Sequence, residues 1–333
     1  MKKLKLCLVG AGNFARYAHG ASLNLLKEND PDLELTAVAD LDAEKAKDFA
    51  RTFNFCRAYT NWREMVETEH PDGISILTGV AATAVTACDI LAAGYPVMIE
   101  KPPGRNRKEI LAIQENSRRS GVPTMVALNR RYSPLLNQLL QLVHTECGEP
   151  IEFVGVEFCR FERLDDDFST TSIHGIDTIR FLAGTPFVRV ELRYQPLARE
   201  KNAWNIELDC RFQNGVAGHI SFRPSTGAAC ERYTISTRHW MFVAKTVIPG
   251  GGSDRPGEIE IFHNGALLRK EAPTPCRLNG NDLYLSGYYG ENATFIRRLR
   301  EGFPCDNDLE VTLDAVEIAD ALRHHQANWE KTK

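Results

Sequence analysis

Long apolar runs and basic patches are both missing from this sequence. None of its apolar stretches approaches the ~20 residues that a membrane span requires. Its 40 basic and 44 acidic residues are spread along the chain, without the basic stripe of a nucleic-acid-binding protein or the polybasic patch of a membrane-binding one. The start, MKKLKLCLVG, has an apolar part shorter than the ~7–15 residues of a secretory signal. We therefore expect a cytoplasmic protein without nucleic-acid or membrane partners.

Disulfide and metal-ligand motifs are also missing. The nine cysteines are odd in number and are never arranged as CxxC, which argues against a disulfide framework and a structural zinc site. The nine histidines include no HExxH or comparable ligand cluster. The pattern predicts free thiols and no metal ion.

The first half of the chain alternates strand and helix patterns. A chain of 333 residues exceeds what one hydrophobic core usually serves, so we expect two domains. We expect strands at 3–9, 33–40, 73–78, 95–100 and 122–128, and helices from the first turn to about 27 and at 42–53, 83–93 and 107–120. This alternation predicts an α/β fold, with a Rossmann doubly wound parallel sheet over residues 1–130.

Residues 131–333 have a different pattern. Residues 204–213 alternate apolar and polar side chains, and Asn214-Gly215 follows as a hairpin signal. Asn264-Gly265 repeats that signal further along the chain. We therefore expect a C-terminal α+β domain with an open, mainly antiparallel sheet. Apolar residues spaced as on one helix face predict a helix over 309–332 that packs back on the body.

The segment LVGAGNFA is typical of a phosphate-binding turn. It puts Gly10, Gly12 and Ala15 directly after the first strand and at the start of a helix. Gly10 permits the tight turn, Gly12 leaves room for a pyrophosphate, and Ala15 lets the helix approach the sheet. Asn13 and Phe14 lie in the same loop, where the N–H groups of a helix start attract an anion. These five residues predict a dinucleotide site.

Asp40, which ends the second strand in the segment VAD, indicates which dinucleotide binds. A carboxylate at this place accepts hydrogen bonds from both ribose hydroxyls and repels a 2′-phosphate. Residue 41 is leucine, so no arginine follows to bind that phosphate. The sequence therefore favours NAD over NADP as the cofactor.

Two further strand ends supply a candidate active-site edge. Thr78 ends one apolar run, and Glu100-Lys101 ends the next, in the segment VMIEKPPG. Ligands of such sheets bind at the carboxyl ends of the strands, so Thr78, Glu100 and Lys101 should lie at the edge that carries the phosphate loop. From the residues alone, this charged pair is either a solvated strand end or part of a site.

Together these segments resemble the glucose–fructose oxidoreductase / inositol dehydrogenase / MocA (Gfo/Idh/MocA) family. The shared motifs are GAGNFA, the VAD strand, HPDGISILT, EKP at 100–102, NRRYSP at 129–134 and IHGID at 173–177. The resemblance implies an NAD(P)-dependent oxidoreductase that interconverts a secondary alcohol and a ketone on a sugar, polyol or related small polar substrate. It also implies that residues 1–130 bind NAD, whereas residues 131–333 bind substrate and form a homodimer or homotetramer.

The same resemblance implies roles for residues of the site. Glu100 is expected on the nicotinamide side of the cofactor, and Lys101 is expected to contact both cofactor and substrate. His174 matches the family's catalytic histidine, which makes it the expected base and Lys101 its electrostatic partner. Asp177 lies on the same helix face and is expected to orient the imidazole or to bind backbone or substrate.

Three more residues are expected to bind substrate. Asn129 and Arg131 follow a strand at the carboxyl edge, and Thr170 stands where the family often has Asp. The family also often has a T-P-x-x-x-H loop where this chain has TGVAATA. Both departures remove polar groups near the substrate and argue against inositol itself as the substrate.

Two other functions stay open at this point. Some relatives keep NAD bound and cleave glycosides with no net redox change, and some relatives with this fold are non-catalytic NAD-binding or sugar-binding sensors. Tightly copurified NAD would favour the first alternative, and loss of the catalytic pair would favour the second. Because Lys101 and His174 are both present, we expect an enzyme.

Overall fold

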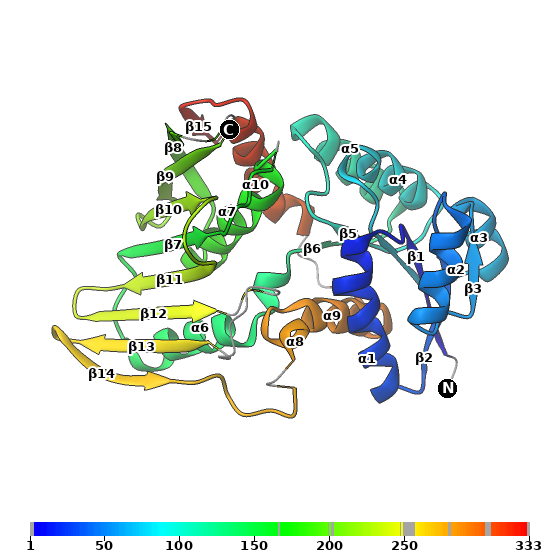
Figure 1. Ribbon diagram of the computed structural model, residues 1–333, viewed down its shortest axis with the longest axis horizontal. Coiled ribbons are helices and arrows are strands. Elements are labelled where there is room, and N and C mark those ends of the chain that lie inside the picture. Colours follow the sequence, from blue (N-terminus) through cyan, green and yellow to red (C-terminus); the bar gives the residue numbers. More distant parts are fainter. Residues whose placement is uncertain are drawn as a thin grey trace. The chain divides into compact units, whose positions relative to one another are not determined.

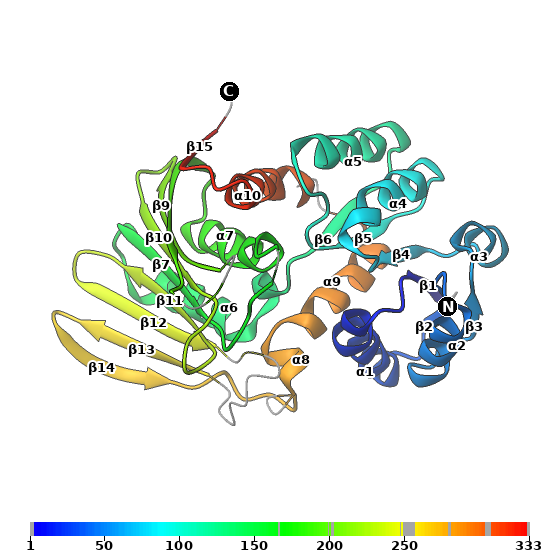
Figure 2. The same ribbon diagram turned by 45° about the horizontal axis from the view of Figure 1, so that its top comes forward.

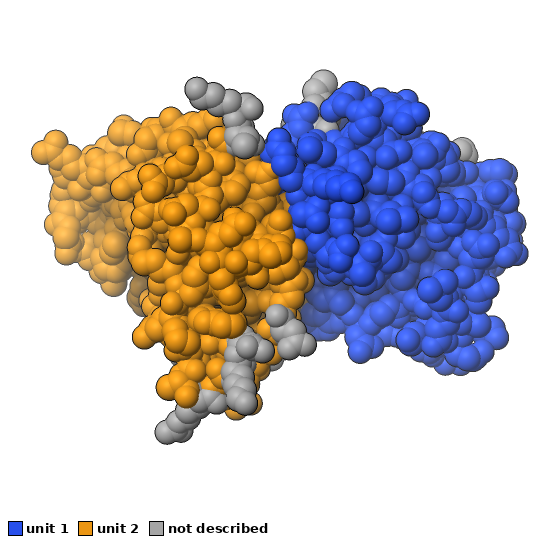
Figure 3. Space-filling model, turned by 90° about the horizontal axis from the view of Figure 1, so that it is seen from above, with its two compact units in different colours: residues 1–128, 288–313 blue, residues 129–287, 314–333 orange. Residues whose placement is uncertain are grey.

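The protein divides into two compact units (Figures 1 and 3). The computed structural model describes residues 3–165, 167–198, 200, 203–246, 248, 257–278, 281–303 and 308–331. Unit 1 contains residues 1–128 and 288–313, and unit 2 contains residues 129–287 and 314–333. The chain therefore passes between the units after residues 128, 287 and 313. The division of functions at residue 130 stays a prediction.

The sheet of unit 1 is parallel, with the strand order β3-β2-β1-β4-β5-β6 (Figures 1 and 2). Its strands are β1 (Leu4–Val9), β2 (Leu33–Ala39), β3 (Arg57–Tyr59), β4 (Gly73–Ile76), β5 (Val97–Glu100) and β6 (Thr124–Ala127). Strands β4 and β6 are buried along their whole length, as the near-continuous apolar run at 73–78 predicts for β4. The order reverses between β1 and β4, and ligands of this fold bind at that reversal. The predicted Rossmann sheet is confirmed, and the edge strand β3 was not predicted.

The helices of unit 1 come from both of its chain segments. They are η1 (Ala15–Gly20), α1 (Ala21–Asn29), α2 (Ala43–Thr52), α3 (Trp62–Glu69), α4 (Val80–Ala92), α5 (Arg107–Ser120) and α9 (Tyr288–Glu301). Helix α5 ends at Gly121, which has the left-handed conformation that glycine allows. Helix α9 comes from the second segment of the unit and packs on α1 and η1. A Cβ on Gly73 would lie 2.5 Å from the Leu299 side chain, which shows how closely α9 also approaches β4.

In the described part of unit 2, one sheet has the order β14-β13-β12-β11-β7-β10-β9-β8-β15 and is antiparallel except between β7 and β10. Its strands are β7 (Phe153–Cys159), β8 (Phe187–Pro196), β9 (Trp204–Phe212), β10 (Ala217–Arg223), β11 (Cys230–Ser236), β12 (Trp240–Thr246), β13 (Glu258–His263), β14 (Ala266–Glu271) and β15 (Asn328–Glu330). The alternation predicted for β9 is confirmed, because its apolar positions from Ile206 to Phe212 are buried. Hairpins at Asn214-Gly215 and Asn264-Gly265 join antiparallel neighbours, as predicted.

Unit 2 also contains helices. They are η2 (Asn129–Tyr132), α6 (Pro134–Glu146), α7 (Ser169–Ala183), α8 (Asp282–Leu285) and the later part of α10 (Asp308–Arg323). Helix α7 packs on β7 and β10, where Gly175 faces Phe222 so closely that a Cβ would lie 2.7 Å from the ring. Helix α10 is shorter than the helix predicted over 309–332. His325 takes a left-handed conformation with φ 49°, after which β15 pairs with β8.

Three predictions about composition concern the described residues. The described cysteines are free thiols, whereas Cys305 lies outside the described residues. In the ranges given above, no group of three or more histidine, cysteine, aspartate or glutamate side chains is arranged to hold a metal ion. None of the described helices has both the length and the apolar character needed to cross a membrane.

Candidate active site

The loop after β1 forms a tight turn that brings two strand ends together. Gly10 has φ +101°, and its N–H donates to the carbonyl of Ala39 at 2.8 Å. A Cβ on Gly10 would lie 2.5 Å from the Leu77 carbonyl oxygen, so a side chain is excluded by backbone. A Cβ on Gly12 would meet nothing within 4 Å, and the residue is exposed. Gly10 is thus required by the fold, whereas Gly12 leaves space outside the chain.

Asp40 is fixed beside this loop by backbone amides. The N–H of Ala11 donates to Oδ2 at 2.7 Å, and the N–H of Asp42 donates to Oδ1 at 2.9 Å. Each carboxylate oxygen has more than one acceptor position, so capacity remains for the two hydroxyls of a ribose. The residue is half-buried and lies at the end of β2, as predicted.

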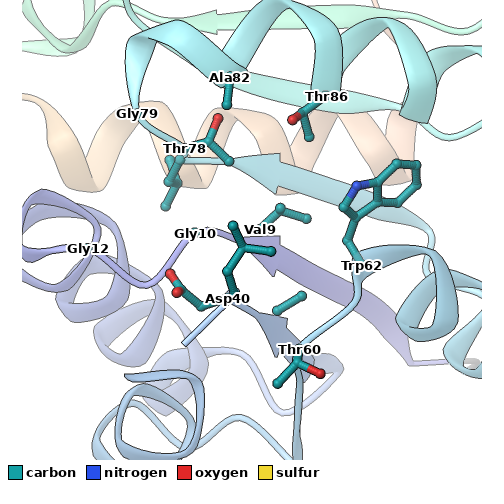
Figure 4. A pocket seen from close by; sticks show the side chains of 13 residues that line it. Val9, Gly10, Gly12, Asp40, Thr60, Trp62, Thr78, Gly79, Ala82 and Thr86 are labelled. Atoms are coloured by element: carbon teal, nitrogen blue, oxygen red, sulfur yellow. The ribbon is translucent and has the colours of Figure 1, made fainter. Parts of the chain in front are cut away.

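A cavity of about 360 Å³ lies against the loop and Asp40 (Figure 4). Figure 4 shows Gly12 at one end of this cavity and Trp62 and Thr86 at the other, with Asp40 between them. Its lining contains the predicted residues Gly10, Gly12, Asp40 and Thr78, together with Val9, Ala39, Leu41, Thr60, Trp62, Leu77, Gly79, Ala82 and Thr86.

Sequence reasoning missed the Thr60–Trp62 side of the cavity. These residues follow β3, which is too short to produce an apolar pattern. The available signal was Asn61, which accepts the N–H of Arg63 as the N-cap of α3 and so marks a helix start.

The residues around the cavity fit a bound dinucleotide. An exposed glycine next to a helix start offers room and N–H groups for a pyrophosphate, and Asp40 offers acceptors for a ribose. Leu41 is 96% exposed beside Asp40 and supplies an apolar contact surface at the rim. Ala15 is buried in η1, as its predicted role in close packing requires, and Asn13 is exposed in the loop.

The Glu100-Lys101 pair lies at the carboxyl end of β5. Lys101 Nζ lies 4.0 Å from Oε1 of Glu100 and 5.6 Å from the centre of the Phe14 ring. The lysine side chain is only 16% exposed, which argues against a freely solvated strand end. The Phe14 ring also packs edge-on against Tyr288 of α9. Two predicted cofactor residues, Phe14 and Glu100, therefore contact or approach Lys101 within unit 1.

In unit 2, three predicted substrate residues are held by hydrogen bonds within the unit. Arg131 binds the buried Asp177 through both guanidinium nitrogens that face it, with Nε 2.9 Å from Oδ2. Asn129 donates from Nδ2 to the carbonyl of Ser286 at 2.7 Å and accepts from Arg130. These contacts join η2 to α7 and to the end of α8. The predicted substrate roles of Asn129, Arg131 and Asp177 stay predictions.

His174 and Thr170 lie in the first half of α7. His174 is buried, and its carbonyl accepts from the Thr178 hydroxyl at 2.6 Å. Thr170 is half-buried and donates from Oγ1 to the Asp167 carbonyl at 3.1 Å. The catalytic role of His174 and the substrate role of Thr170 stay predictions.

A buried ion cluster stands next to η2. Glu231 of β11 is bound by Arg130 and Arg160, and it accepts the Tyr233 hydroxyl at 2.6 Å. Burial by itself would raise the pKa of Glu231, but the two guanidinium groups outweigh it and lower the pKa to about 2. The Arg160 side chain is therefore used inside unit 2.

The turn, the carboxylate and the parallel sheet define a dinucleotide-binding protein of the Rossmann type. Residues 4–128 match a family model described as "Oxidoreductase family, NAD-binding Rossmann fold" (GFO_IDH_MocA). Residues 4–128 thus resemble the NAD-binding domain of the Gfo/Idh/MocA oxidoreductases, and the resemblance predicted from the motifs is confirmed.

Individual relatives match less of the chain. Inositol 2-dehydrogenase of Corynebacterium glutamicum (strain R) is 26% identical over 202 residues, which is 58% of each chain. Trans-1,2-dihydrobenzene-1,2-diol dehydrogenase of Mus musculus is 30% identical over 110 residues, which is 33% of each chain. The chain therefore covers less than two thirds of the length of either relative.

Both units share their fold with a solved structure. The crystal structure of a Gfo/Idh/MocA family oxidoreductase from Vibrio cholerae matches 97% of this chain and 98% of its own. The TM-score is 0.78 at 20% identity, which establishes a common fold. The Rossmann unit followed by an open, mainly antiparallel sheet is therefore confirmed.

Proposed function

We propose that this protein is an NAD-dependent oxidoreductase that interconverts a secondary alcohol and a ketone on a small polar substrate. One observation carries the proposal: Asp40 is fixed by two backbone N–H groups beside an exposed glycine turn. This arrangement suits the ribose and pyrophosphate of NAD and opposes the 2′-phosphate of NADP. The family model, which describes an NAD-binding fold, supports the same cofactor.

The proposed substrate class is a ring-shaped polyol or sugar with neighbouring hydroxyl groups. The names of the two relatives support this class, because inositol and dihydrobenzene-1,2-diol both carry adjacent secondary hydroxyls on a six-membered ring. Thr170 and the TGVAATA loop make the site less polar than the family's usual pattern. We therefore propose a less polar ring than inositol.

The proposed chemistry assigns one task to each of two side chains. NAD, when bound, accepts the hydride from the substrate carbon. Lys101 would hold its proton on Nζ and stabilise the negative charge that develops on the substrate oxygen. His174 would take the hydroxyl proton onto its imidazole, which is suited to proton transfer near neutral pH. The mechanism therefore assigns stabilisation of the substrate oxygen to Lys101 and proton transfer to His174.

NADH formation over a panel of cyclic diols, inositols, sugars and sugar acids, with NAD or NADP, tests this proposal. Lys101→Ala should lower kcat by ~10²–10⁴-fold, because it removes the group that stabilises the oxyanion. Lys108→Ala is the matched control, since Lys108 lies exposed on α5 of the same unit. Equal turnover by Lys101→Ala and the wild-type protein would contradict the assignment.

The same preparations separate the alternatives. If NAD stays bound in stoichiometric amount and the substrate is cleaved without net formation of NADH, the protein is a redox-neutral enzyme and not a dehydrogenase. If the protein binds a ligand without any turnover, it is a sensor and not an enzyme.

We also propose that the protein forms a homodimer or homotetramer. The support is the face of the unit 2 sheet that points away from α6 and α7, where half-buried side chains such as Glu157, Glu207 and His219 lie in rows. Light scattering at two protein concentrations tests this proposal, and a monomeric mass at both would reject it.

A further inference from the structure

A fully buried histidine lies inside the helix that follows the phosphate loop. His19 is 0% exposed and belongs to η1, whose wide π-helical turn is marked by the Ala21 N–H bonding back to the Arg16 carbonyl. A π-helical turn closes its hydrogen bond over one more residue than an α-helical turn does, and such turns often occur at functional sites. The other buried residues of η1 are small, so His19 is its one large buried side chain.

Three side chains from two distant segments surround this ring. Nε2 of His19 lies 3.0 Å from Oε2 of Glu100 and 3.9 Å from Oε1 of Glu291. Nδ1 lies 3.3 Å from Oδ1 of Asn292. Glu291 and Asn292 are buried in α9, and Glu100 ends β5. We call these four residues the His19 network.

The partners determine where His19 holds its proton. Ionised carboxylates only accept hydrogen bonds, so Nε2 carries a proton when it bonds Glu100. The amide of Asn292 can either accept from Nδ1 or donate to it, and its Nδ2 also bonds the Tyr288 carbonyl at 2.8 Å. The network therefore accommodates a neutral or a charged imidazole while the bond to Glu100 stays in place.

Glu100 connects this network to Lys101. Its Oε2 faces His19 at 3.0 Å, whereas its Oε1 is 4.0 Å from Lys101 Nζ, beyond hydrogen-bond distance. One carboxylate oxygen thus bonds the histidine, whereas the other forms only a longer ion pair with the neighbouring ammonium. Two adjacent residues of opposite charge would otherwise gain energy from a direct hydrogen-bonded pair at this poorly solvated place.

We propose that His19 is a positioning residue for Lys101. By bonding Glu100 from the interior side, His19 holds this carboxylate at a distance from Lys101 and leaves the ammonium directed at the carboxyl edge of the sheet. The inference rests on the proposed function for its consequence in catalysis, but the effect on Lys101 exists without any substrate.

The proposal makes a definite statement about the charge of Lys101. Without His19, the Glu100 carboxylate would move toward Lys101 and stabilise its charged form, so the pKa of Lys101 would rise. The groups that face His19 from the surrounding elements are Glu100 of β5 and Glu291 of α9, together with the rings of Phe14 and Tyr288. None of these groups except Glu100 comes from the segment that carries Lys101.

The first test compares His19→Asn with His19→Gln. The glutamine amide can reach the position of Nε2 and bond Glu100, whereas the shorter asparagine amide reaches only the position of Nδ1. His19→Asn should raise the pKa of Lys101 by about half a unit or more, and His19→Gln should leave it near the wild-type value. The measurement is NMR titration of ¹³C-dimethylated lysines, with the Lys101 signal assigned by its loss in Lys101→Arg.

Kinetics provide a second reading once a substrate is known. His19→Asn should lower kcat by about tenfold and shift the alkaline limb of the pH profile upward, because the ammonium is held by Glu100. The Kd for NAD should change less than about twofold, since the phosphate loop is not altered. His19→Gln should recover most of the lost kcat. Equal kcat in His19→Asn and the wild-type protein would overturn the proposal.

Glu100→Gln shows whether the effect passes through Glu100. This variant removes the carboxylate, so the pKa of Lys101 should fall, and adding His19→Asn should then produce no further change. If His19→Asn still shifts Lys101 in the Glu100→Gln protein, His19 acts by another route and the proposal is wrong. If His19→Asn does not fold, an unchanged Lys101 titration in Glu100→Gln alone overturns it.

The NMR titration tests the positioning role of His19, and the substrate panel tests the proposed function, so each proposal can be refuted without the other. A protein without turnover on any substrate, but with the expected Lys101 shifts, would refute the proposed function and keep the positioning role. A protein with turnover and no Lys101 shift in His19→Asn would keep the function and refute the positioning role.

Discussion

The two units use their carboxylates in opposite ways. In unit 1, Asp40 is fixed by backbone N–H groups and remains half exposed at a cavity. In unit 2, Asp177 and Glu231 are buried and bound by arginine side chains. A carboxylate held by amides keeps acceptor positions for a ligand, whereas Glu231, enclosed by two guanidinium groups, is a structural counter-ion. A charged residue near a strand end therefore indicates a site only when its partners are known.

The largest expected effect concerns the counter-ion in unit 2. Glu231→Gln should lower the free energy of unfolding by ~3–5 kcal/mol, because Arg130 and Arg160 lose their buried counter-charge. Glu157→Gln is the matched control, since its ion pair with Arg232 lies at the surface and should contribute only ~0–1 kcal/mol. Urea denaturation of the three proteins measures both values. Similar losses in the two variants would break the contrast between buried and exposed carboxylates.

Acid should remove most of the difference in unfolding free energy between the wild-type protein and Glu231→Gln. The folded-state pKa of Glu231, about 2, lies below its ordinary value of 4.5, so the stabilisation by this carboxylate is present above pH 4.5 and is lost as the pH falls toward 2. A shift of this size corresponds to about 3 kcal/mol. The gap between wild-type and Glu231→Gln unfolding free energies should therefore shrink by about that amount between pH 5 and pH 2. A constant gap across this range would show that the carboxylate gains no charge stabilisation.

The two glycines of the phosphate loop should respond differently to the same added methyl group. Gly10→Ala should destabilise the protein by about 2 kcal/mol, because the residue has positive φ and faces the Leu77 carbonyl. Gly12→Ala should change stability by less than about 0.5 kcal/mol and instead weaken NAD binding at least tenfold. Thermal unfolding and NAD titration distinguish the two effects. If Gly12→Ala bound NAD normally, the open space beside Gly12 would not be the pyrophosphate site.

The smallest expected effect tests the cofactor preference of Asp40. Asp40→Asn removes the charge but keeps one oxygen acceptor for the backbone amide of Ala11 or Asp42. NAD should bind about tenfold more weakly, a change of ~1.4 kcal/mol, and the preference for NAD over NADP should narrow. Fluorescence titration with both dinucleotides measures this change. An unaltered ratio of the two affinities would assign the selectivity to another residue.

Whether the sequence predicts a feature of the site depends on how far apart the contacting residues lie along the chain. The turn at Gly10, the carboxylate of Asp40 and the Glu100-Lys101 pair each follow an apolar strand directly, so a short segment is enough to predict them. Glu231 could not be predicted in this way, because Arg130 lies 101 residues from it in the sequence. The environment of His19 could not be predicted either, since its partner Asn292 lies 273 residues away in the sequence.

Two elements, β3 and β15, were not predicted from the sequence for other reasons. Strand β3 covers only three residues at the edge of its sheet, which is too short for a recognisable period. The helix predicted over 309–332 has apolar spacing to Leu322, but the chain then turns at His325. Trp329 packs on Phe187 and donates to Glu317 at 3.0 Å, which fixes the last residues as a strand. Tertiary contacts, rather than local preference, determine both elements.

The interleaving of the two units has a consequence for synthesis at the ribosome. Helix α9, which packs on α1 and η1 of unit 1, emerges only after strands β7 to β14 of unit 2 have been made. Strand β15 of unit 2 emerges later still. Neither unit is therefore finished before the other has begun, and a fragment that stops near residue 130 lacks the helix that Gly73 and His19 pack against. The nascent chain completes its dinucleotide-binding unit only after strands β7 to β14 of the other unit have been made.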